Sequence, residues 1–208
     1  MSDTSSEWDL VRQARNNDQE ALAELFGKHR DRLRNMVRLR LNPRLAGRVD
    51  ASDVIQEAYL EAARVLKEYL DNPQIPFFLW LRHLAGQKLI EAHRRHLGSQ
   101  KRGADREVSL QRGAIPGANS ESMAIDLIGR IATPSLISMK AEMKSQLEQI
   151  LDGMDPTDRE VLVLRHFEHL TNTETAQVLG IDKSAASKRY IRALERIQQT
   201  MESMESQF

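Results

Sequence analysis

The stretch of residues 171–201, TNTETAQVLGIDKSAASKRYIRALERIQQTM, has the pattern of two helices joined by a tight turn. Ala176 is small, as is needed where two helices cross closely, and Gly180 can supply the left-handed backbone of the turn. Asp182 can then cap the second helix. The pattern favours a helix-turn-helix, although ordinary helical hairpins also carry a small residue four positions before a glycine.

The second helix of this pair has the side chains of a helix that reads DNA. Its serines and alanines are short enough for the helix to enter a major groove, and its lysines and arginines can reach phosphates and base edges. The candidate DNA-binding residues on this helix are Lys183, Ser184, Ser187, Lys188, Arg189 and Arg192.

Helical signals continue through the rest of the chain. Asp155 followed by Pro156 predicts the start of another helix, because aspartate caps well and proline fits the first helical position. Apolar residues at spacings of three and four predict helices over residues 18–42, 52–70 and 77–98. No segment has the alternating pattern of a strand. The sequence therefore predicts an all-α fold.

Residues 98–138 differ in composition from the chain on either side. They hold five of the ten glycines, two of the six prolines and no aromatic residue. Such a stretch is typical of a linker, and its scattered apolar residues allow one short helix and docking of a part of it. We expect two small helical domains, residues 1–98 and 139–208, joined by a flexible linker over residues 99–138.

Basic residues gather in the helix over residues 77–98 and just beyond it. Between positions 82 and 106, seven lysines and arginines are opposed by only two acids. Three aromatic residues, Phe77, Phe78 and Trp80, lie immediately upstream. Cations beside aromatic rings suit unpaired nucleic acid, because phosphates need cations and splayed bases need stacking surfaces. The alternative is that the rings are core residues, which we favour for Phe78 and Trp80.

Composition excludes several classes of protein. The 208 residues contain no cysteine, which removes disulfides, thiol catalysis and thiolate metal sites. His93 and His96 have the spacing of a metal pair, but no carboxylate is placed to complete a coordination shell. We therefore expect no metal site, no cofactor and no enzymatic activity.

Charge and hydropathy limit the options further. The chain has 30 basic and 30 acidic residues, so it is not uniformly basic. No apolar run approaches the ~20 residues that span a bilayer, and the acidic, polar N-terminus is unlike a signal peptide. We expect a cytoplasmic protein without membrane insertion.

Three segments, taken in order, resemble bacterial RNA polymerase sigma factors. DASDVIQEAYLEAARVLKEY, at residues 50–69, resembles the second conserved region of these proteins. PFFLWLRHLAGQKLIEAHRRHL, at residues 76–97, is similar to the helices that melt and recognise promoter DNA. DPTDREVLVLRHFEHLTNTETAQVLGIDKSAASKRYIRALERI, at residues 155–197, resembles the C-terminal promoter-binding domain. The missing intermediate domain indicates the extracytoplasmic-function (ECF) branch. Within this branch, the amino-acid sequence is most similar to planctomycete-type members.

The resemblance implies a role for each domain. Asp53, Gln56 and Glu57 match a motif that packs on the clamp helices of the polymerase β′ subunit. Residues 1–98 would bind core polymerase and recognise and melt the −10 element, and residues 139–208 would recognise the −35 element. The linker would run toward the polymerase active-site channel. The expected partners are core RNA polymerase, through its β′ and β subunits, and promoter DNA, and an anti-sigma factor is a further candidate.

The expected melting site is the turn over residues 71–75 together with the basic helix after it. An asparagine and flanking prolines favour a non-helical loop that can shape a pocket for one base. Polar residues one to four turns further along can then track the displaced strand. The candidate DNA-binding residues of this site are Asn72, Arg82, Gln87, Lys88, Glu91, Arg94 and Arg95.

Four residues depart from the family pattern in the helix-turn-helix. Thr175 and Ala186 stand where the family usually has Ile or Val, and each loss of buried methyl groups would weaken the domain by about 1–3 kcal/mol. Ala185 and Ser187 alter the usual reading face, so the upstream sequence preference cannot be transferred.

Taken together, the residues and the resemblance predict an RNA polymerase sigma factor, a specificity subunit that helps to open promoter DNA. Two other functions fit parts of the pattern. A stand-alone helix-turn-helix regulator would give a specific footprint without polymerase. A helical adaptor that binds only protein would never crosslink to DNA, even with polymerase present.

Overall fold

The computed structural model describes most of the chain, namely residues 3–16, 18–45, 47–97, 115–131 and 140–205. All regular structure within these ranges is helical, which confirms the predicted all-α fold. The chain forms two compact units, Met1–Pro116 and Gly117–Phe208. No helix in the described ranges is both long enough and apolar enough to cross a membrane.

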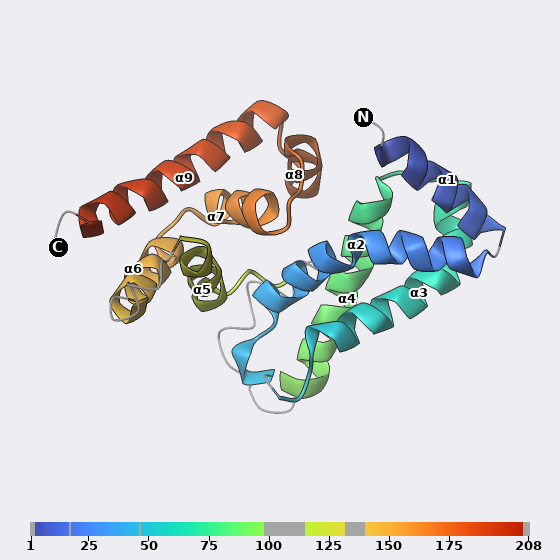
Figure 1. The fold of residues 1–208 in the computed structure, drawn as a ribbon, viewed down its shortest axis with the longest axis horizontal. Helices are drawn as coiled ribbons and strands as arrows, with labels where there is room; N and C mark the ends of the chain where they lie inside the picture. The colour runs from blue at the N-terminus through green and yellow to red at the C-terminus, as the bar shows by residue number, and fades with distance from the viewer. Residues whose placement is uncertain (1–2, 17, 46, 98–114, 132–139, 206–208) are drawn as a thin grey trace. The chain divides into compact units, whose positions relative to one another are not determined.

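The first unit contains four α-helices among its described residues (Figure 1). Their bounds are α1 Asp3–Arg15, α2 Gln19–Arg40, α3 Ala51–Asp71 and α4 Phe77–Leu97, with a 3₁₀ turn, η1, at Pro43–Leu45. α3 packs against α4 and α2, and α1 packs against α2 and α3. The three helices predicted from apolar spacing are confirmed as α2, α3 and α4, whereas α1 is an element that this spacing does not predict.

Local capping explains where α2 and α3 begin. The carboxylate of Asp18 accepts two backbone N–H groups in the first turn of α2 and caps the helix, as predicted. Asp50 and Asp53 form a capping box at α3: Asp50 accepts the N–H of Ser52 at 2.8 Å, and Asp53 accepts the N–H of Asp50 at 3.2 Å. Two prolines stand between α3 and α4, and proline cannot continue a helix.

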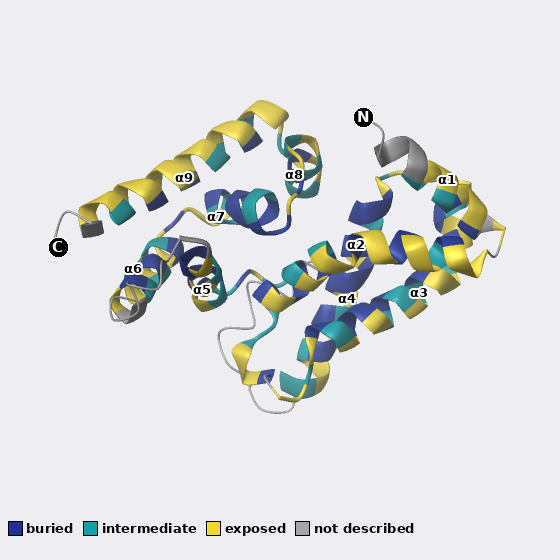
Figure 2. Ribbon diagram, viewed as in Figure 1, coloured by how far each residue is buried: buried dark blue, intermediate teal, exposed yellow. Residues whose placement is uncertain are grey.

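The buried faces of α2, α3 and α4 form the apolar core of the first unit (Figure 2). Its fully buried members include Leu25, Leu33, Met36, Ala58, Ala62, Leu81 and Leu89. Phe78 is buried, as predicted, and the Arg32 guanidinium lies 3.6 Å from the centre of its ring. Trp80 is only partly buried and stacks on Tyr69, with 4.5 Å between the ring centroids.

The second unit contains five α-helices among its described residues. Their bounds are α5 Ser120–Ile131, α6 Lys140–Asp152, α7 Pro156–Leu162, α8 Asn172–Leu179 and α9 Lys183–Glu205, with a π-helical turn, η4, at Val163–Phe167. α5 packs against α6, and α9 packs against α7 and α8. Asp155 caps α7 and Pro156 follows at its first position, as predicted.

The described part of the predicted linker contains the one short helix that its apolar residues allow, but this helix belongs to the second unit. Residues 117–131 belong to the second unit, and α5 lies within them. The buried residues at helical spacing on α5 are Met123, Ala124, Leu127 and Ile128. This short apolar stripe is sufficient to pack a helix against α6, so the unit begins well before residue 139. Residues 99–114 and 132–138 of the predicted linker lie outside the described residues.

Ile115, the first described residue after α4, packs against that helix. A Cβ atom added at Gly86 would lie 2.5 Å from both Cδ1 and Cγ1 of Ile115, far inside contact distance. Glycine at position 86 therefore allows this close approach of the chain to α4.

Candidate polymerase and DNA interfaces

One side of α3 carries the residues predicted to bind polymerase. Asp53 and Gln56 are exposed and Glu57 is partly exposed, and their spacing places them on one side of the helix. Leu60 continues this stripe and is 69% exposed. Sequence reasoning missed Leu60, although extending the stripe by one turn finds it.

The same residues line a groove between α3 and α4. The groove has a volume of about 380 Å³, and its lining residues are Arg48, Val49, Asp53, Val54, Gln56, Glu57, Leu60, Ala92, Arg95 and His96. The residues from α3 supply two carboxylates, and those from α4 supply Arg95 and His96. The groove therefore combines apolar surface with both signs of charge.

Both carboxylates of the groove already have a partner within the first unit. Asp53 accepts the N–H of Asp50 in the capping box of α3. Glu57 Oε1 lies 3.5 Å from Arg95 Nη1, in an ion pair between α3 and α4 whose side chains are largely exposed. Asp53 is therefore a structural residue as well as a candidate contact, whereas Glu57 has a single, weak surface ion pair within the described part of the first unit.

The exposed side of α4 brings most of the predicted −10 residues together. Gln87 Nε2 lies 3.0 Å from His83 Nε2, and Lys88 Nζ lies 3.1 Å from a carboxylate oxygen of Glu91. Arg94 is exposed and has no hydrogen bond or ion pair to another described residue. Its guanidinium is therefore available to a phosphate.

Arg82 departs from the predicted set, because the fold buries it. Its exposed fraction is 5%. Positions 78, 82, 85 and 89 recur at helical spacing and are all buried, so the arginine lies on the core side of α4. Arg82 is therefore not a DNA-contacting residue of the folded unit.

Asn72 ends α3 and begins the turn that is predicted to hold an unpaired base. Its N–H donates to the carbonyl of Tyr69 at 3.3 Å, and its side-chain oxygen accepts from Gln74 Nε2 at 2.5 Å. The Tyr69 hydroxyl donates to the carbonyl of Ile75 at 2.8 Å and so ties the far end of the turn to α3. The turn therefore follows a defined, non-helical path with Asn72 exposed at its start.

The backbone of α8 and α9 confirms the helix-turn-helix. Thr171 and Glu174 form a capping box at α8. Gly180 has φ 63° and ψ 32°, the left-handed conformation predicted for the turn. Asp182 Oδ1 accepts the N–H of Ala185 at 2.7 Å and caps α9, also as predicted.

The predicted contacts on α9 fall into two groups. Four of them are exposed in its first two turns: Lys183, Ser184, Ser187 and Lys188. The other two, Arg189 and Arg192, form ion pairs with Asp158 of α7 at 2.6 and 3.2 Å. Only the first group is unconstrained by contacts to α7.

Thr175 and Ala186, the departures from the family pattern in the helix-turn-helix, are both fully buried. The Thr175 hydroxyl has no hydrogen-bond partner within the described part of the chain. A polar atom therefore occupies a core position where the family has a methyl group.

His93 joins α4 to the end of α2. Its Nε2 accepts the N–H of Asn42 at 3.3 Å, and burial lowers the pKa of His93 below its ordinary value. The ring is therefore a neutral acceptor in a structural contact. In the residues that the structure describes, no group of three or more His, Cys, Asp or Glu is placed to hold a metal ion.

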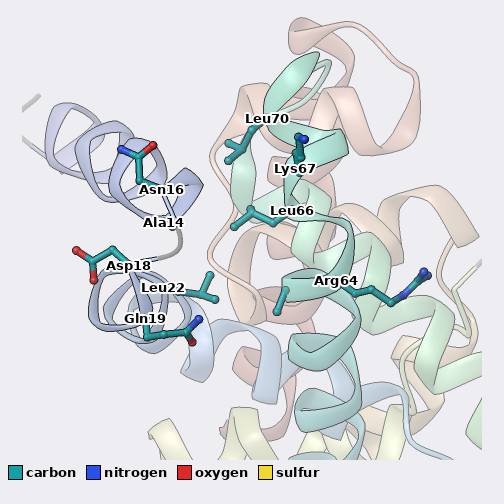
Figure 3. Close-up of a pocket in the computed structure, with 10 residues that line it drawn as sticks. Ala14, Asn16, Asp18, Gln19, Leu22, Arg64, Leu66, Lys67 and Leu70 are labelled. Atoms are coloured by element: carbon teal, nitrogen blue, oxygen red, sulfur yellow. The ribbon is translucent and has the colours of Figure 1, made fainter.

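A second pocket of the first unit contains none of the predicted site residues. It has a volume of about 470 Å³ and lies between the α1–α2 connection and the C-terminal half of α3 (Figure 3). Figure 3 shows Leu22 and Leu66 pointing toward each other across it. Its lining includes one carboxylate, the helix cap Asp18, and no histidine, so it does not resemble a catalytic or metal site.

These features define a helical DNA-binding protein of two units, with a helix-turn-helix in the second. A family model described as ECF sigma factor matches residues 5–203. The chain therefore belongs to the ECF sigma factor family. It is an RNA polymerase sigma factor, which binds core polymerase, recognises promoter DNA and promotes transcription initiation, and it is not an enzyme.

Individual relatives are similar along most of the chain. The ECF RNA polymerase sigma factor SigD of Mycobacterium tuberculosis is 27% identical over 188 residues, which cover 90% of this chain and 80% of the relative. The ECF RNA polymerase sigma-E factor of Escherichia coli K12 is 24% identical over 197 residues, 95% of each chain. Among solved structures, CnrH in complex with the cytosolic domain of CnrY has a TM-score of 0.52 at 19% identity, covering 93% of this chain and 96% of that one. This likeness shows a shared fold.

Proposed function

We propose that the first unit binds core polymerase and opens the −10 element, and that the second unit reads the −35 element. The observation that carries this division is the groove of the first unit, where the α3 side holds Gln56 and Glu57 and α4 leads on to the exposed Arg94. The pair of helices α3 and α4 can thus bind polymerase on one side and the displaced strand of promoter DNA along α4.

The chemistry of the groove favours a helix of the polymerase β′ clamp as its occupant. An apolar side chain of that helix can cover Leu60, and its basic side chains can pair with Asp53 and Glu57. Burial of an exposed leucine contributes about 1.5–3 kcal/mol, whereas an exposed ion pair contributes about 0–1 kcal/mol. Leu60 is therefore the expected anchor, and the carboxylates supply orientation.

Variants of the groove test this proposal in the full-length chain. Leu60→Asp removes the apolar contact, Glu57→Lys reverses a charge, and Glu68→Lys makes the same reversal on α3 outside the groove. We expect Leu60→Asp to weaken competition for core polymerase by about tenfold or more, Glu57→Lys to weaken it by up to about fivefold, and Glu68→Lys to have no effect. Equal competition by all three would contradict the assignment. Asp53→Lys is a poorer probe, because loss of the capping box alone costs about 0.5–2 kcal/mol of stability.

The proposed DNA contacts are those candidates that the fold leaves at the surface. For the −10 element they are Asn72, Gln87, Lys88, Glu91, Arg94 and Arg95. For the −35 element they are Lys183, Ser184, Ser187 and Lys188, with Arg192 as a further phosphate contact.

Three narrower proposals concern branch, regulation and location. The amino-acid sequence of residues 50–69 and 155–197 supports membership of the planctomycete-like branch. A phylogeny of ECF sigma factors tests this membership. CnrH is bound to the cytosolic domain of CnrY, and we propose that this chain also has an anti-sigma partner, which would compete with core polymerase for it. Because a sigma factor acts where polymerase is, we propose a cytoplasmic location, which cell fractionation tests.

A further inference from the structure

Asp158, in the first turn of α7, holds two arginines of α9. Its carboxylate is 4% exposed, with Oδ1 2.6 Å from Arg189 Nη1 and Oδ2 3.2 Å from Arg192 Nη1. Asp155 Oδ1 lies 3.1 Å from the same nitrogen of Arg189. One buried acid therefore contacts two adjacent turns of the helix that carries the predicted DNA contacts.

This contact restricts how α9 can sit on α7. An ionised acid out of water is strongly destabilising unless cations and hydrogen bonds replace its hydration. Successive residues of an α-helix are about 100° apart around its axis. A rotation of α9 about that axis by less than this angle would therefore move Arg189 or Arg192 away from Asp158. The ion pairs therefore set the direction in which the first turns of α9 face.

We propose that Asp158 is a positioning residue for promoter reading, and that Arg189 acts through it instead of contacting a base. The inference rests on the proposed function of the second unit, the reading of the −35 element. Contacts to bases then fall to the exposed start of α9, where the side chains of Lys183, Ser187 and Lys188 have no hydrogen bond or ion pair to another described residue.

The competing explanation, in which Arg189 itself reads DNA, makes the opposite prediction for Asp158. Neutralising the acid with Asp158→Asn would then release Arg189 and leave its DNA contact intact or stronger. If the pair acts in positioning, both Asp158→Asn and Arg189→Ala remove the contact between Asp158 and Arg189, and Asp158→Asn also releases Arg192. Asp158→Asn then loses at least as much discrimination as Arg189→Ala, and the double variant loses no more than Asp158→Asn alone.

Promoter discrimination by the holoenzyme provides the test. A promoter is selected from genomic fragments by in-vitro transcription with the wild-type holoenzyme, and base pairs of its upstream element are then altered one at a time. The measured quantity is the affinity of the holoenzyme for the intact upstream element divided by its affinity for the altered element. We expect Asp158→Asn and Arg189→Ala each to lower this ratio by about tenfold, without a change in the salt dependence of binding. Lys188→Ala, which removes a neighbouring exposed cation, should reduce the salt slope by about one.

Rescue and stability measurements separate positioning from loss of the fold. All affinities are measured well below the lowest midpoint of thermal unfolding. Arg189→Lys keeps a cation beside Asp158 and should recover most of the discrimination. If Asp158→Asn does not fold, Asp158→Glu, which keeps the charge on a longer side chain, must still lower the ratio.

Three results would overturn the inference. In the first, Asp158→Asn discriminates between the promoters as the wild type does while Arg189→Ala does not. In the second, Arg189→Ala lowers the salt slope of binding. In the third, both variants are less stable but discriminate as the wild type does. A different result marks failure of the proposed function itself: if Ser187→Ala and Lys188→Ala also bind the upstream element as the wild type does, α9 is not the reading helix.

Discussion

At the scale of single residues, the hydroxyl of Thr175 weakens the helix-turn-helix. The side chain is fully buried and its Oγ1 has no hydrogen-bond partner among the described residues, so its desolvation is not compensated. We expect Thr175→Val, which has nearly the same shape, to raise the free energy of unfolding by about 1–2 kcal/mol. Urea denaturation of the full-length chain measures this change.

Thr173 offers the matched control, because it lies on α8 but is exposed. Thr173→Val should change the free energy of unfolding by less than about 0.5 kcal/mol. A lower urea midpoint for Thr175→Val would show that the hydroxyl is satisfied in solution, for instance by a buried water.

His93 makes the first unit sensitive to acid. Burial lowers the pKa of His93 in the folded chain, so the unfolded chain takes up the proton first as the pH falls. The stability that this ring contributes is complete above its unfolded pKa of about 6.5, and it is lost as the pH falls from there toward the folded pKa.

We expect His93→Gln to flatten this pH dependence, because glutamine keeps an acceptor for the Asn42 N–H but does not titrate. The measurement is the midpoint of thermal unfolding of both chains at a series of pH values between about 5 and 7.5. An equally steep decline in the wild type and the variant would assign the acid sensitivity to other groups.

At the scale of the element, α4 is the helix that we expect to hold the melted strand. Arg94 is exposed and not bound to another described residue, so Arg94→Ala removes the proposed phosphate contact without disturbing the fold. We expect about a three- to tenfold loss of open complex at unchanged affinity for core polymerase. Asn72→Ala should act in the same direction. Permanganate reactivity of unpaired thymines reports opening directly.

Arg30→Ala is the control for this experiment, because Arg30 is an exposed cation of the same unit on α2. Its permanganate pattern should match that of the wild type. Arg95→Ala is less clean, since it also breaks the ion pair with Glu57. Wild-type reactivity in both Arg94→Ala and Asn72→Ala would mean that α4 is only a basic surface.

Elements with local signals are the ones that sequence predicts well. Asp18, Asp155 and Asp182 cap helices as predicted, and Gly180 makes the turn, because caps and turns depend on residues within about four positions. α1 is polar, and α5 carries its apolar stripe over only 12 residues. Such helices are stabilised by tertiary packing, which spacing along the chain does not reveal.

The candidate sites illustrate the same limit. Arg82, Arg94 and Arg189 look alike in the sequence, since each is a cation on a helix with a basic side. A neighbour distant in sequence separates them: the core buries Arg82, and Asp158 binds Arg189, while Arg94 stays exposed. Leu60 is the opposite case, an apolar residue that the fold leaves at the surface of a groove.

For the whole molecule, the balance of charge limits what the chain can do without polymerase. Its 30 basic residues are matched by 30 acidic ones, and two arginines of α9 are paired with Asp158. Non-specific affinity for DNA grows with the number of phosphates that cations neutralise. We therefore expect no specific footprint of the purified chain alone at about 0.15 M salt, where exposed charges are screened within about 8 Å.

The holoenzyme on the same promoter fragment is the positive control and should protect both promoter elements. A specific footprint by the chain alone would instead support a stand-alone regulator. A holoenzyme that never crosslinks to the fragment would contradict the assignment of the DNA contacts.

The packing of Ile115 on Gly86 limits how this sequence can evolve. A Cβ atom at position 86 would lie 2.5 Å from Ile115, so the isoleucine occupies the space that a side chain at position 86 would need. Alanine at position 86 therefore requires Ile115 to move or to be replaced by a smaller residue, and the two sites should covary across homologues. Alanine would favour the helix by about 1 kcal/mol, so the glycine in the middle of α4 is explained by the packing of Ile115 and not by the helix itself.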